Sequence, residues 1–378
     1  MTAKTRQLPR VDAQPGLPLY LVVQKAVRAA IDGGVYAPGD QLPSTKALSA
    51  QLDVSLVTVH RALQELVSDG VLRRGQGRGT YVHEDYAQRA ETTAGLRFGL
   101  VFHSESSLGD FYHGHVLEGV RQAADELGVD LVLLRFGEDW RNECQGYLYV
   151  NPFESQLDRP PRFGARVKPK GGKSAAVSHP VMVIGASFER PGASSIDTDN
   201  RDMACRAVDH LHALGHRRIG YIGGDGSVSN DRDRWAGFRE ACQRFGISVD
   251  QEHVVQTTGW RTDEAGKSRL GAMLGSAQRP TAIIGAGYYY ALDVYEQAGK
   301  LGLSIPNDLS VVGVDDPPSA VHLSPPLTTM RQPLIQLGRQ AAKGLFEQVG
   351  DEQAPTQRTM LSAELVVRRS TGHAPKTK

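Results

Sequence analysis

Basic, hydroxyl and imidazole side chains gather between positions 46 and 80, and together they have the chemistry needed to bind nucleic acid. The candidates for DNA contact are Lys46, Ser55, Thr58, His60, Arg61, Arg73, Gln76, Arg78 and Thr80. Guanidinium and ammonium groups bind phosphates, whereas hydroxyl, amide and imidazole groups also reach base edges. One such charge alone is more often an ordinary solvated side chain, and the formal net charge of the chain is only +1. The prediction of DNA binding therefore depends on the secondary structure predicted around these residues.

The elements predicted around these residues form a helix-turn-helix. A first helix runs from Leu17 to the glycine pair at 33–34, with apolar residues at helical spacing. Ser44 is placed to cap a short second helix that ends near Leu52, and Ser55 to cap a third. The third helix has an apolar face formed by Val59, Ala62, Leu63, Leu66 and Val67. Two helices joined by so short a turn are typical of DNA-binding proteins.

A glycine-rich hairpin is predicted directly after the third helix. Residues 71–74 and 80–82 have the character of two short strands, and Gly-Gln-Gly-Arg-Gly at 75–79 joins them. Glycines allow backbone amides to approach a phosphate closely, and Arg78 adds a charge that suits a phosphate or the minor groove. The hairpin is therefore interpreted as the wing of a winged helix-turn-helix.

Residues 17–83 resemble the GntR-family DNA-binding domain. The similar stretches are LPLYLVVQKAVRAAI, APGDQLPSTKALSAQLDVS, TVHRAL and GQGRGTYV. The resemblance implies a DNA-binding role, and Lys46 stands at the family's basic position after Leu-Pro-Ser. Two positions depart from the family pattern, because Leu56 and His60 stand where arginines are usual and Arg61 follows.

The remainder of the chain is predicted to be an α/β domain. A polar lead-in is expected over 1–16, the winged helix over 17–85, a linker over 86–95 and the larger domain over 96–372. In the larger domain short apolar strands alternate with amphipathic helices, which indicates βαβ units and parallel sheets. The predicted strands are 98–101, 131–134, 147–150, 181–184, 219–222, 282–284 and 311–314.

Polar and aromatic residues that follow these strands are the candidates for ligand binding, because such sheets bind ligands at the carboxyl ends of strands. The candidate effector-binding residues are His103, Asp110, Ser187, Arg232, Tyr288 and Asp315. This mixture suits a polyhydroxylated ligand and would also suit other polar ligands. The basic, glycine- and proline-rich segment 159–180 is interpreted as a solvated loop in preference to an anion or DNA contact.

This larger domain resembles the LacI/GalR-type effector-binding domain, which is similar to periplasmic sugar-binding proteins. The resemblance is carried by SIDTDNRDMACRAVDHLHALGHRRIGYIGG, DRDRWAGFREAC, RPTAIIGAG, IPNDLSVVGVDD, SPPLTTMRQPLIQLGRQAA and ELVVRRST. It implies two lobes crossed by three segments, and dimerisation through the first lobe. A GntR-type head joined to such a sensor resembles the arabinose-repressor type of architecture.

The same resemblance implies roles for individual residues. Arg232 corresponds to the arginine that grips sugar hydroxyls, and it is followed by Arg234 and the Trp-Ala-Gly-Phe stretch. Asp315 and Asp316 correspond to the family's paired acids. The resemblance implies that one of the pair either contacts the ligand or braces the hinge between the lobes. Where the family usually has Ala-Asn-Asp, this chain has Ala-Gly-Tyr at 286–288, so the carboxylate that commonly binds sugar is missing. The segment between Leu134 and Tyr147 also departs from the family, because it is too short for a full helix.

The sequence favours a regulator over an enzyme. It contains no nucleophile turn, metalloprotease motif or phosphate loop. Its three scattered cysteines argue against a structural zinc site, and no cofactor is expected. The absence of a secretory signal or an apolar span favours the cytoplasm. We expect a homodimeric repressor that binds a pseudo-palindromic DNA operator under control of a carbohydrate-like effector; the alternative is a ligand-independent regulator whose sensor fold is only a dimerisation scaffold.

Overall fold

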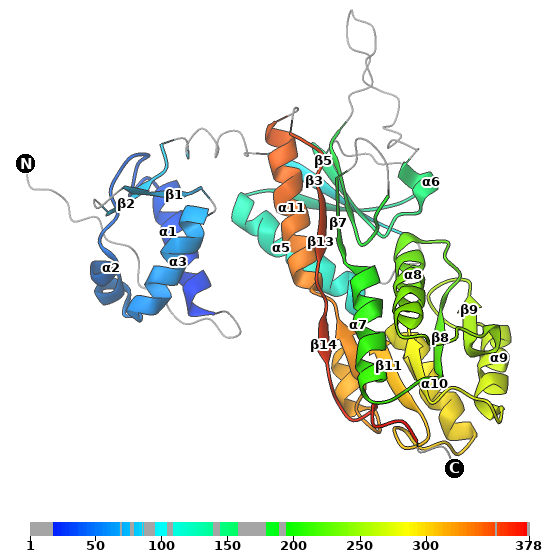
Figure 1. Cartoon of the computed structure of the whole chain (residues 1–378). Helices are drawn as coiled ribbons and strands as arrows, with labels where there is room; N and C mark the ends of the chain where they lie inside the picture. The colour runs from blue at the N-terminus through cyan, green and yellow to red at the C-terminus, as the bar shows by residue number, and fades with distance from the viewer. Residues whose placement is uncertain are drawn as a thin grey trace, which may run out of the picture. The chain divides into compact units, whose positions relative to one another are not determined.

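The chain folds into two compact units, Met1–Ala94 and Gly95–Lys378, which are described separately (Figure 1). The structure is a computed structural model. It describes residues 18–68, 70–75, 79–84, 86, 95–103, 109–138, 144–157, 179–188, 194–351 and 354–375. The predicted lead-in, most of the predicted linker and of the basic segment 159–180, and the candidates Gln76 and Arg78 lie outside these ranges.

The first unit contains the predicted helices and hairpin. Its elements are α1 (Leu19–Asp32), α2 (Thr45–Leu52), α3 (Leu56–Ser68), β1 (Leu72–Gly75) and β2 (Gly79–Val82). The Ser44 hydroxyl accepts a hydrogen bond from the Ala47 amide and so caps α2, as predicted. Asp53 has φ of 56°, and this left-handed residue makes the sharp turn between α2 and α3. The apolar faces of the three helices close around Val23, Leu48 and Val59, which are fully buried.

The second unit has two lobes, each built on one six-stranded sheet. The sheet of the first lobe has the order β13-β7-β6-β5-β3-β4, and its strands are all parallel. The sheet of the second lobe has the order β14-β12-β11-β10-β8-β9, and only β14 is antiparallel to its neighbour. This confirms the α/β class and the parallel sheets predicted from the sequence.

The chain alternates strand and helix through both lobes. The elements of the first lobe are β3 (Arg97–Phe102), α5 (Phe111–Leu127), β4 (Asp130–Arg135), β5 (Gly146–Val150), α6 (Glu154–Leu157), β6 (Val181–Ile184), β7 (Ser194–Thr198), α11 (Leu334–Gly350) and β13 (Arg358–Leu361). The elements of the second lobe are α7 (Asn200–Ala213), β8 (Ile219–Gly224), α8 (Ser229–Arg244), η1 (Gln251–His253), β9 (Val254–Thr257), α9 (Glu264–Gly275), β10 (Ala282–Gly285), α10 (Tyr288–Lys300), β11 (Ser310–Val314), η2 (Pro318–His322), β12 (Thr328–Arg331) and β14 (Glu364–Val366).

The chain crosses between the lobes where β7 leads to α7, where β12 leads to α11, and where β13 leads to β14. Their number agrees with the three crossing segments that the family resemblance implied. All seven predicted strands are present, whereas β7, β9, β12, β13 and β14 were not predicted. Among the described residues between β4 and β5 there is no helix, in agreement with the short segment noted there.

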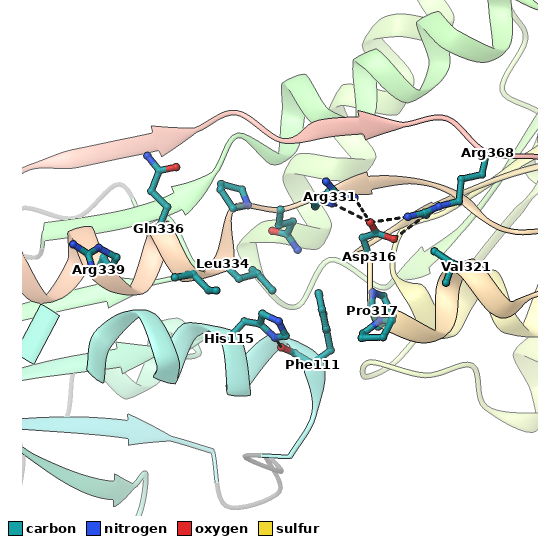
Figure 2. A pocket seen from close by; sticks show the side chains of 14 residues that line it. Phe111, His115, Asp316, Pro317, Val321, Arg331, Leu334, Gln336, Arg339 and Arg368 are labelled. Carbon is teal, nitrogen blue, oxygen red and sulfur yellow. Dashed lines mark hydrogen bonds and ion pairs between the residues drawn. The ribbon is translucent and has the colours of Figure 1, made fainter. Parts of the chain in front are cut away.

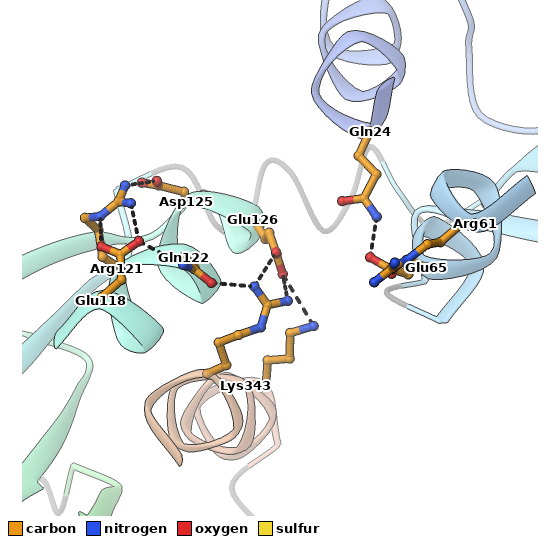
Figure 3. Close-up of polar contacts among 10 residues, drawn as sticks. Gln24, Arg61, Glu65, Glu118, Arg121, Gln122, Asp125, Glu126 and Lys343 are labelled. Atoms are coloured by element: carbon orange, nitrogen blue, oxygen red, sulfur yellow. Dashed lines mark hydrogen bonds and ion pairs between the residues drawn. The ribbon is translucent and has the colours of Figure 1, made fainter. Parts of the chain in front are cut away.

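Helices α5 and α11 lie side by side on the first lobe (Figure 1) and approach closely at two glycines. A Cβ on Gly119 would lie 2.0 Å from the Ile335 carbonyl oxygen, and one on Gly338 would lie 2.2 Å from the Val116 carbonyl oxygen. Backbone stands in the way in both cases, so neither contact can be relieved by turning a side chain. The rim of this helix pair is polar, with Arg121 paired to Glu118 and Asp125, and Glu126 paired to Lys343 (Figure 3).

We expect Gly119→Ala to lower the free energy of unfolding of the second unit by about 1–3 kcal/mol, because the added methyl forces the two helices apart. Gly299→Ala is the matched control, since nothing lies within 4 Å of a Cβ there. Alanine is the better helix former, so this control should leave stability unchanged or raise it by up to about 1 kcal/mol. Urea unfolding followed by circular dichroism measures both; equal stability of the two variants would contradict the close packing.

Candidate DNA interface and candidate ligand site

The outward face of α3 is the centre of the candidate DNA interface. Val59, Ala62, Leu63 and Leu66 are buried, so the opposite face of the helix carries the exposed residues Val57, His60, Arg61 and Gln64 at positions i, i+3, i+4 and i+7. At its start the Ser55 hydroxyl accepts a hydrogen bond from the Thr58 amide at 3.1 Å and lies 2.7 Å from the Thr58 hydroxyl. The predicted cap is therefore present, and both hydroxyls are engaged in it.

The hairpin brings a further basic residue to this face. Arg74 of β1 lies with Nη2 3.5 Å from Nε2 of His60, and it is paired in register with Thr80 of β2. Lys46 is exposed on the first turn of α2. Arg74 was not among the predicted contact residues, although the alternation of side chains along a strand shows that Arg73 and Arg74 must face opposite ways.

Two of the predicted arginines have partners within their own unit. Arg61 donates from Nε to Glu65 at 3.1 Å, and its guanidinium lies 3.9 Å from the centre of the Tyr20 ring. Glu65 also accepts a hydrogen bond from Gln24 (Figure 3). Arg73 donates to Glu84 at 2.7 Å. These side chains remain solvent-accessible, and exposed pairs of this kind contribute less than about 1 kcal/mol, so both arginines can still exchange their partners for phosphates.

A buried guanidinium lies at the centre of the candidate ligand site between the two lobes. Arg234 of α8 is only 7% exposed. It donates from Nε to the Asn200 side-chain oxygen at 2.8 Å and from Nη1 to the Ala286 carbonyl at 2.7 Å. Asn200 in turn donates to the Asp197 carboxylate at 3.1 Å. A hydrogen-bonded chain thus joins β7, the first crossing, α8 and the end of β10.

Carboxylates surround this guanidinium. Burial raises the pKa of Asp197 to about 7, although the Thr198 amide, Arg234 and Asn200 oppose the rise. Burial also raises the pKa of Asp315, where Arg234 and a 2.7 Å hydrogen bond from Gln332 act in the opposite direction. The site therefore contains acidic groups that are poorly solvated and depend on a single buried cation.

The first lobe contributes a tyrosine and an asparagine to the same place. The Tyr112 hydroxyl donates to the Asn151 side-chain oxygen at 3.3 Å. Burial raises the pKa of Tyr112, and the charges of Asp197 and Asp315 add to this rise. Gly185 leaves the space for this pair, because a Cβ there would lie 2.0 Å from the tyrosine oxygen. Neither Tyr112 nor Asn151 was predicted.

The structure separates the two arginines of α8. Arg232 is exposed and donates to the Gly226 carbonyl at 3.2 Å. Arg234, which directly precedes Trp-Ala-Gly-Phe, is the arginine between the lobes. Of the two arginines, only Arg234 is buried between the lobes.

The other predicted ligand residues lie after their strands but already have partners. Asp110 caps α5 and binds both the amide and the ring of His113; burial would raise the pKa of Asp110, but these hydrogen bonds outweigh it and the pKa is lowered. Ser187 donates from its amide to Ser229 and from its hydroxyl to Asp233, at 3.0 and 3.3 Å. The remaining contacts are His103 to the Asn151 carbonyl at 2.6 Å and Tyr288 to Ser319 at 2.7 Å.

Several buried polar atoms near Arg234 lack a hydrogen-bond partner among the described residues. They are the hydroxyls of Tyr221 and Thr198 and the side-chain oxygen of Asn230. Trp260 is exposed on the loop after β9, and the adjacent Gly259 carbonyl accepts a hydrogen bond from Tyr290. Unsatisfied buried groups are where a bound polar molecule or ordered water would complete the hydrogen bonding. Within the described residues, no cluster of three or more metal-ligating side chains is found.

The second of the paired acids has a structural role. The side chain of Asp316 is 5% exposed and is held by Arg331 and Arg368 (Figure 2). Burial would raise the pKa of Asp316, but the two arginines outweigh it and the pKa is lowered. Arg331 also contacts Glu364, so this cluster joins the second and third crossings. A largely apolar pocket of about 680 Å³ lies beside it, lined in part by Phe111, His115, Pro317, Val321, Leu334 and Ile335.

Comparisons with known proteins agree with both units. The family model for bacterial regulatory proteins of the gntR family matches residues 19–82, and the model for a periplasmic binding protein-like domain matches residues 208–371. The chain is 28% identical to the arabinose metabolism transcriptional repressor of Geobacillus stearothermophilus, over 94% of this chain and 98% of that protein. It is 32% identical to the HTH-type transcriptional repressor CytR of Escherichia coli K12, over 70% of this chain and 77% of that protein.

Solved structures support the fold of the second unit. A LacI family transcriptional regulator from Mycobacterium smegmatis matches with a TM-score of 0.60 and 25% identity, covering 73% of this chain and 99% of that chain. A LacI family regulator from Enterococcus faecium, solved with bound ribose, matches with a TM-score of 0.58 and 20% identity, over 73% of this chain and 98% of that one. No described helix is long and apolar enough to span a bilayer.

We expect Asp197→Asn to change how stability depends on pH. Because the pKa of Asp197 is about 7 in the folded chain and about 4 in an unfolded one, the folded state retains a proton that the unfolded state has lost. The free energy of unfolding of the unaltered protein should therefore fall between about pH 4 and pH 7. Asp197→Asn lacks this loss, so the variant should gain stability relative to the parent across that window.

Chemical unfolding at pH 5, 6, 7 and 8 measures this difference. Asp199→Asn is the control for loss of a carboxylate at the start of α7, since asparagine caps a helix about as well as aspartate. A difference between Asp197→Asn and the parent that is constant over the whole range would contradict the raised pKa.

Proposed function

The chain belongs to the HTH-type transcriptional regulators that join a gntR-family DNA-binding head to a LacI-type, periplasmic-binding-protein-like domain, and from this premise we propose that it is a repressor released from its operator by a small polar effector. Its relatives are regulators and not enzymes, in agreement with the prediction from the sequence. The effector is carbohydrate-like and binds between the lobes. The protein acts in the cytoplasm as a homodimer on a pseudo-palindromic site, because two-fold symmetry presents two equal heads to two half-sites.

The observation that carries the effector proposal is the hydrogen-bonded chain from Arg234 through Asn200 to Asp197. A planar guanidinium with carboxylates beside it can donate to and accept from neighbouring hydroxyls of one ligand. Tyr112 and Asn151 approach the same acids from the first lobe. A ligand that contacts both lobes stabilises one lobe arrangement over another, and that difference in affinity is the most it can contribute to control of the heads.

The names of similar proteins support the same chemical class. One relative is named for arabinose metabolism, and one structural neighbour was solved with ribose. In this chain Gly287 and Tyr288 occupy the start of α10, with the tyrosine hydroxyl bound to Ser319. The effector contacts there are therefore aromatic rather than acidic. His103, Asp110 and Ser187 position the surrounding backbone and side chains through the hydrogen bonds already described.

For the DNA interface, we assign phosphate and base-edge contacts to Lys46, His60, Arg74 and Thr80 on the described surface, with Arg61 and Arg73 exchanging their carboxylate partners for phosphates. Gln76 and Arg78 complete the predicted set. Ser55 and Thr58 hold the first turn of α3 in place through their mutual hydrogen bond. Phosphate contacts of this kind make affinity strongly dependent on salt.

A selection of random DNA duplexes by the full chain tests the proposal directly. The selection is repeated with pools of neutral sugars and of sugar acids. An inverted-repeat site that is lost with one pool supports an effector-released repressor. A site that every pool leaves unchanged supports instead the ligand-independent scaffold, and failure to enrich any site contradicts DNA recognition itself.

We expect Arg234→Lys to weaken effector binding by about 10- to 150-fold, because it removes hydrogen bonds to a charged group that contribute about 1.5–3 kcal/mol. Operator affinity without effector should stay unchanged, since α8 is in the other unit. Arg232→Ala is the matched control and should respond to effector as the parent does. Thermal shift, and release of the operator by the sugar pool that is active on the parent protein, measure both effects. If Arg232→Ala alone loses the response, the ligand site contains Arg232 and not Arg234.

A further inference from the structure

Two adjacent apolar residues are exposed at the first turn of α3. Val57 is 78% exposed and Leu56 is 51% exposed, and Val57 is the most exposed large hydrophobic residue in the described part of the chain. Single exposed apolar residues are common on protein surfaces. Here, however, two lie next to one another on the helix that provides the core of the candidate DNA interface.

The groups around this pair are basic or polar. Lys46 is exposed at the start of α2, and His60 lies one turn after Leu56, in contact with Arg74. Positive charge around an apolar centre complements a partner that has a charged rim and an apolar interior. The phosphates and the floor of a DNA groove have this arrangement, because thymine presents its C5-methyl group in the major groove.

The hydrogen-bonding groups at this end of α3 are engaged within the protein. The Ser55 hydroxyl caps the helix through the Thr58 amide and lies 2.7 Å from the Thr58 hydroxyl. Residues near the start of a recognition helix are the ones that contact base edges. At this start the exposed side chains of Leu56 and Val57 can offer only apolar contact.

We propose that Val57 and Leu56 recognise thymine C5-methyl groups in the operator. This inference rests on the proposed function, and it makes the two residues determinants of sequence specificity. Burial of one methyl group against an apolar side chain changes affinity by roughly fourfold, the equivalent of about 0.8 kcal/mol. Each contacted thymine in a half-site should therefore contribute about that factor.

The test uses the operator enriched by the full chain and replaces each thymine in turn by deoxyuridine, which removes only the methyl group. We expect at least one such position in each half-site to lose roughly fourfold in affinity. With Val57→Thr, which keeps the branched shape but replaces a methyl by a hydroxyl, the effect of deoxyuridine at that position should disappear. Leu56→Ala should do the same at its own position.

Two controls keep the outcomes distinct. Val367→Ala changes another exposed valine, 59% accessible and in the second unit, and should retain the full effect of deoxyuridine. Gln64→Ala changes the same face of α3 and should also retain it, whatever happens to overall affinity. If deoxyuridine has no effect at any position, or an unchanged effect in both the Val57 and Leu56 variants, the inference is overturned while DNA recognition stands. If no operator is enriched, the proposed function fails as well.

Discussion

Burial of a single guanidinium imposes the main constraint on the second unit. A buried cation is costly unless hydrogen bonds and opposite charges replace the water it has lost. Arg234 obtains its hydrogen bonds from Asn200 at the first crossing and from the Ala286 carbonyl after β10. Its opposite charges are Asp197 and Asp315, whose pKa values the guanidinium lowers against the effect of burial. These partners come from distant parts of the sequence, so the ends of several strands and one crossing have to meet at one point.

The charges around Arg234 bear on the kind of ligand that the proposed site could bind. Arg234 lies near more than one acid, and burial raises the pKa of Asp197 to about 7. The Tyr221 hydroxyl and the Asn230 side-chain oxygen are buried without a hydrogen-bond partner in the part of the chain that the structure describes. A neutral molecule with several hydroxyl groups would satisfy such atoms without adding charge, whereas an anion would meet the repulsion of the acids. If the proposed effector binds here, a neutral sugar avoids this repulsion and a sugar acid does not.

The sequence predicts best what is decided locally. The caps at Ser44 and Ser55 depend on bonds to amides three residues away, and both are present. The burial of Arg234 could have been predicted, because Arg234, Phe238 and Ala241 follow helical spacing and face the core together. No such signal exists for Tyr112 and Asn151, because the start of α5 and the end of β5 meet only through the folding of the first lobe. The unpredicted strands are short, and β7 and β12 are rich in polar residues that become buried between neighbouring strands.

The paired acids Asp315 and Asp316 have different surroundings: the first lies in the proposed ligand site and the second in the ion-pair cluster at the crossings. Asp315 lies beside Arg234 in the left-handed region, with φ of 73° and its carbonyl bound by Thr329. The next residue clamps Arg331, which ends β12 at the second crossing and also holds Glu364 just after the third. A shift of the Asp315 backbone therefore acts directly on the ion-pair cluster that ties two crossings together. The proposed ligand site and the ion-pair cluster at the crossings are therefore separated by a single peptide bond.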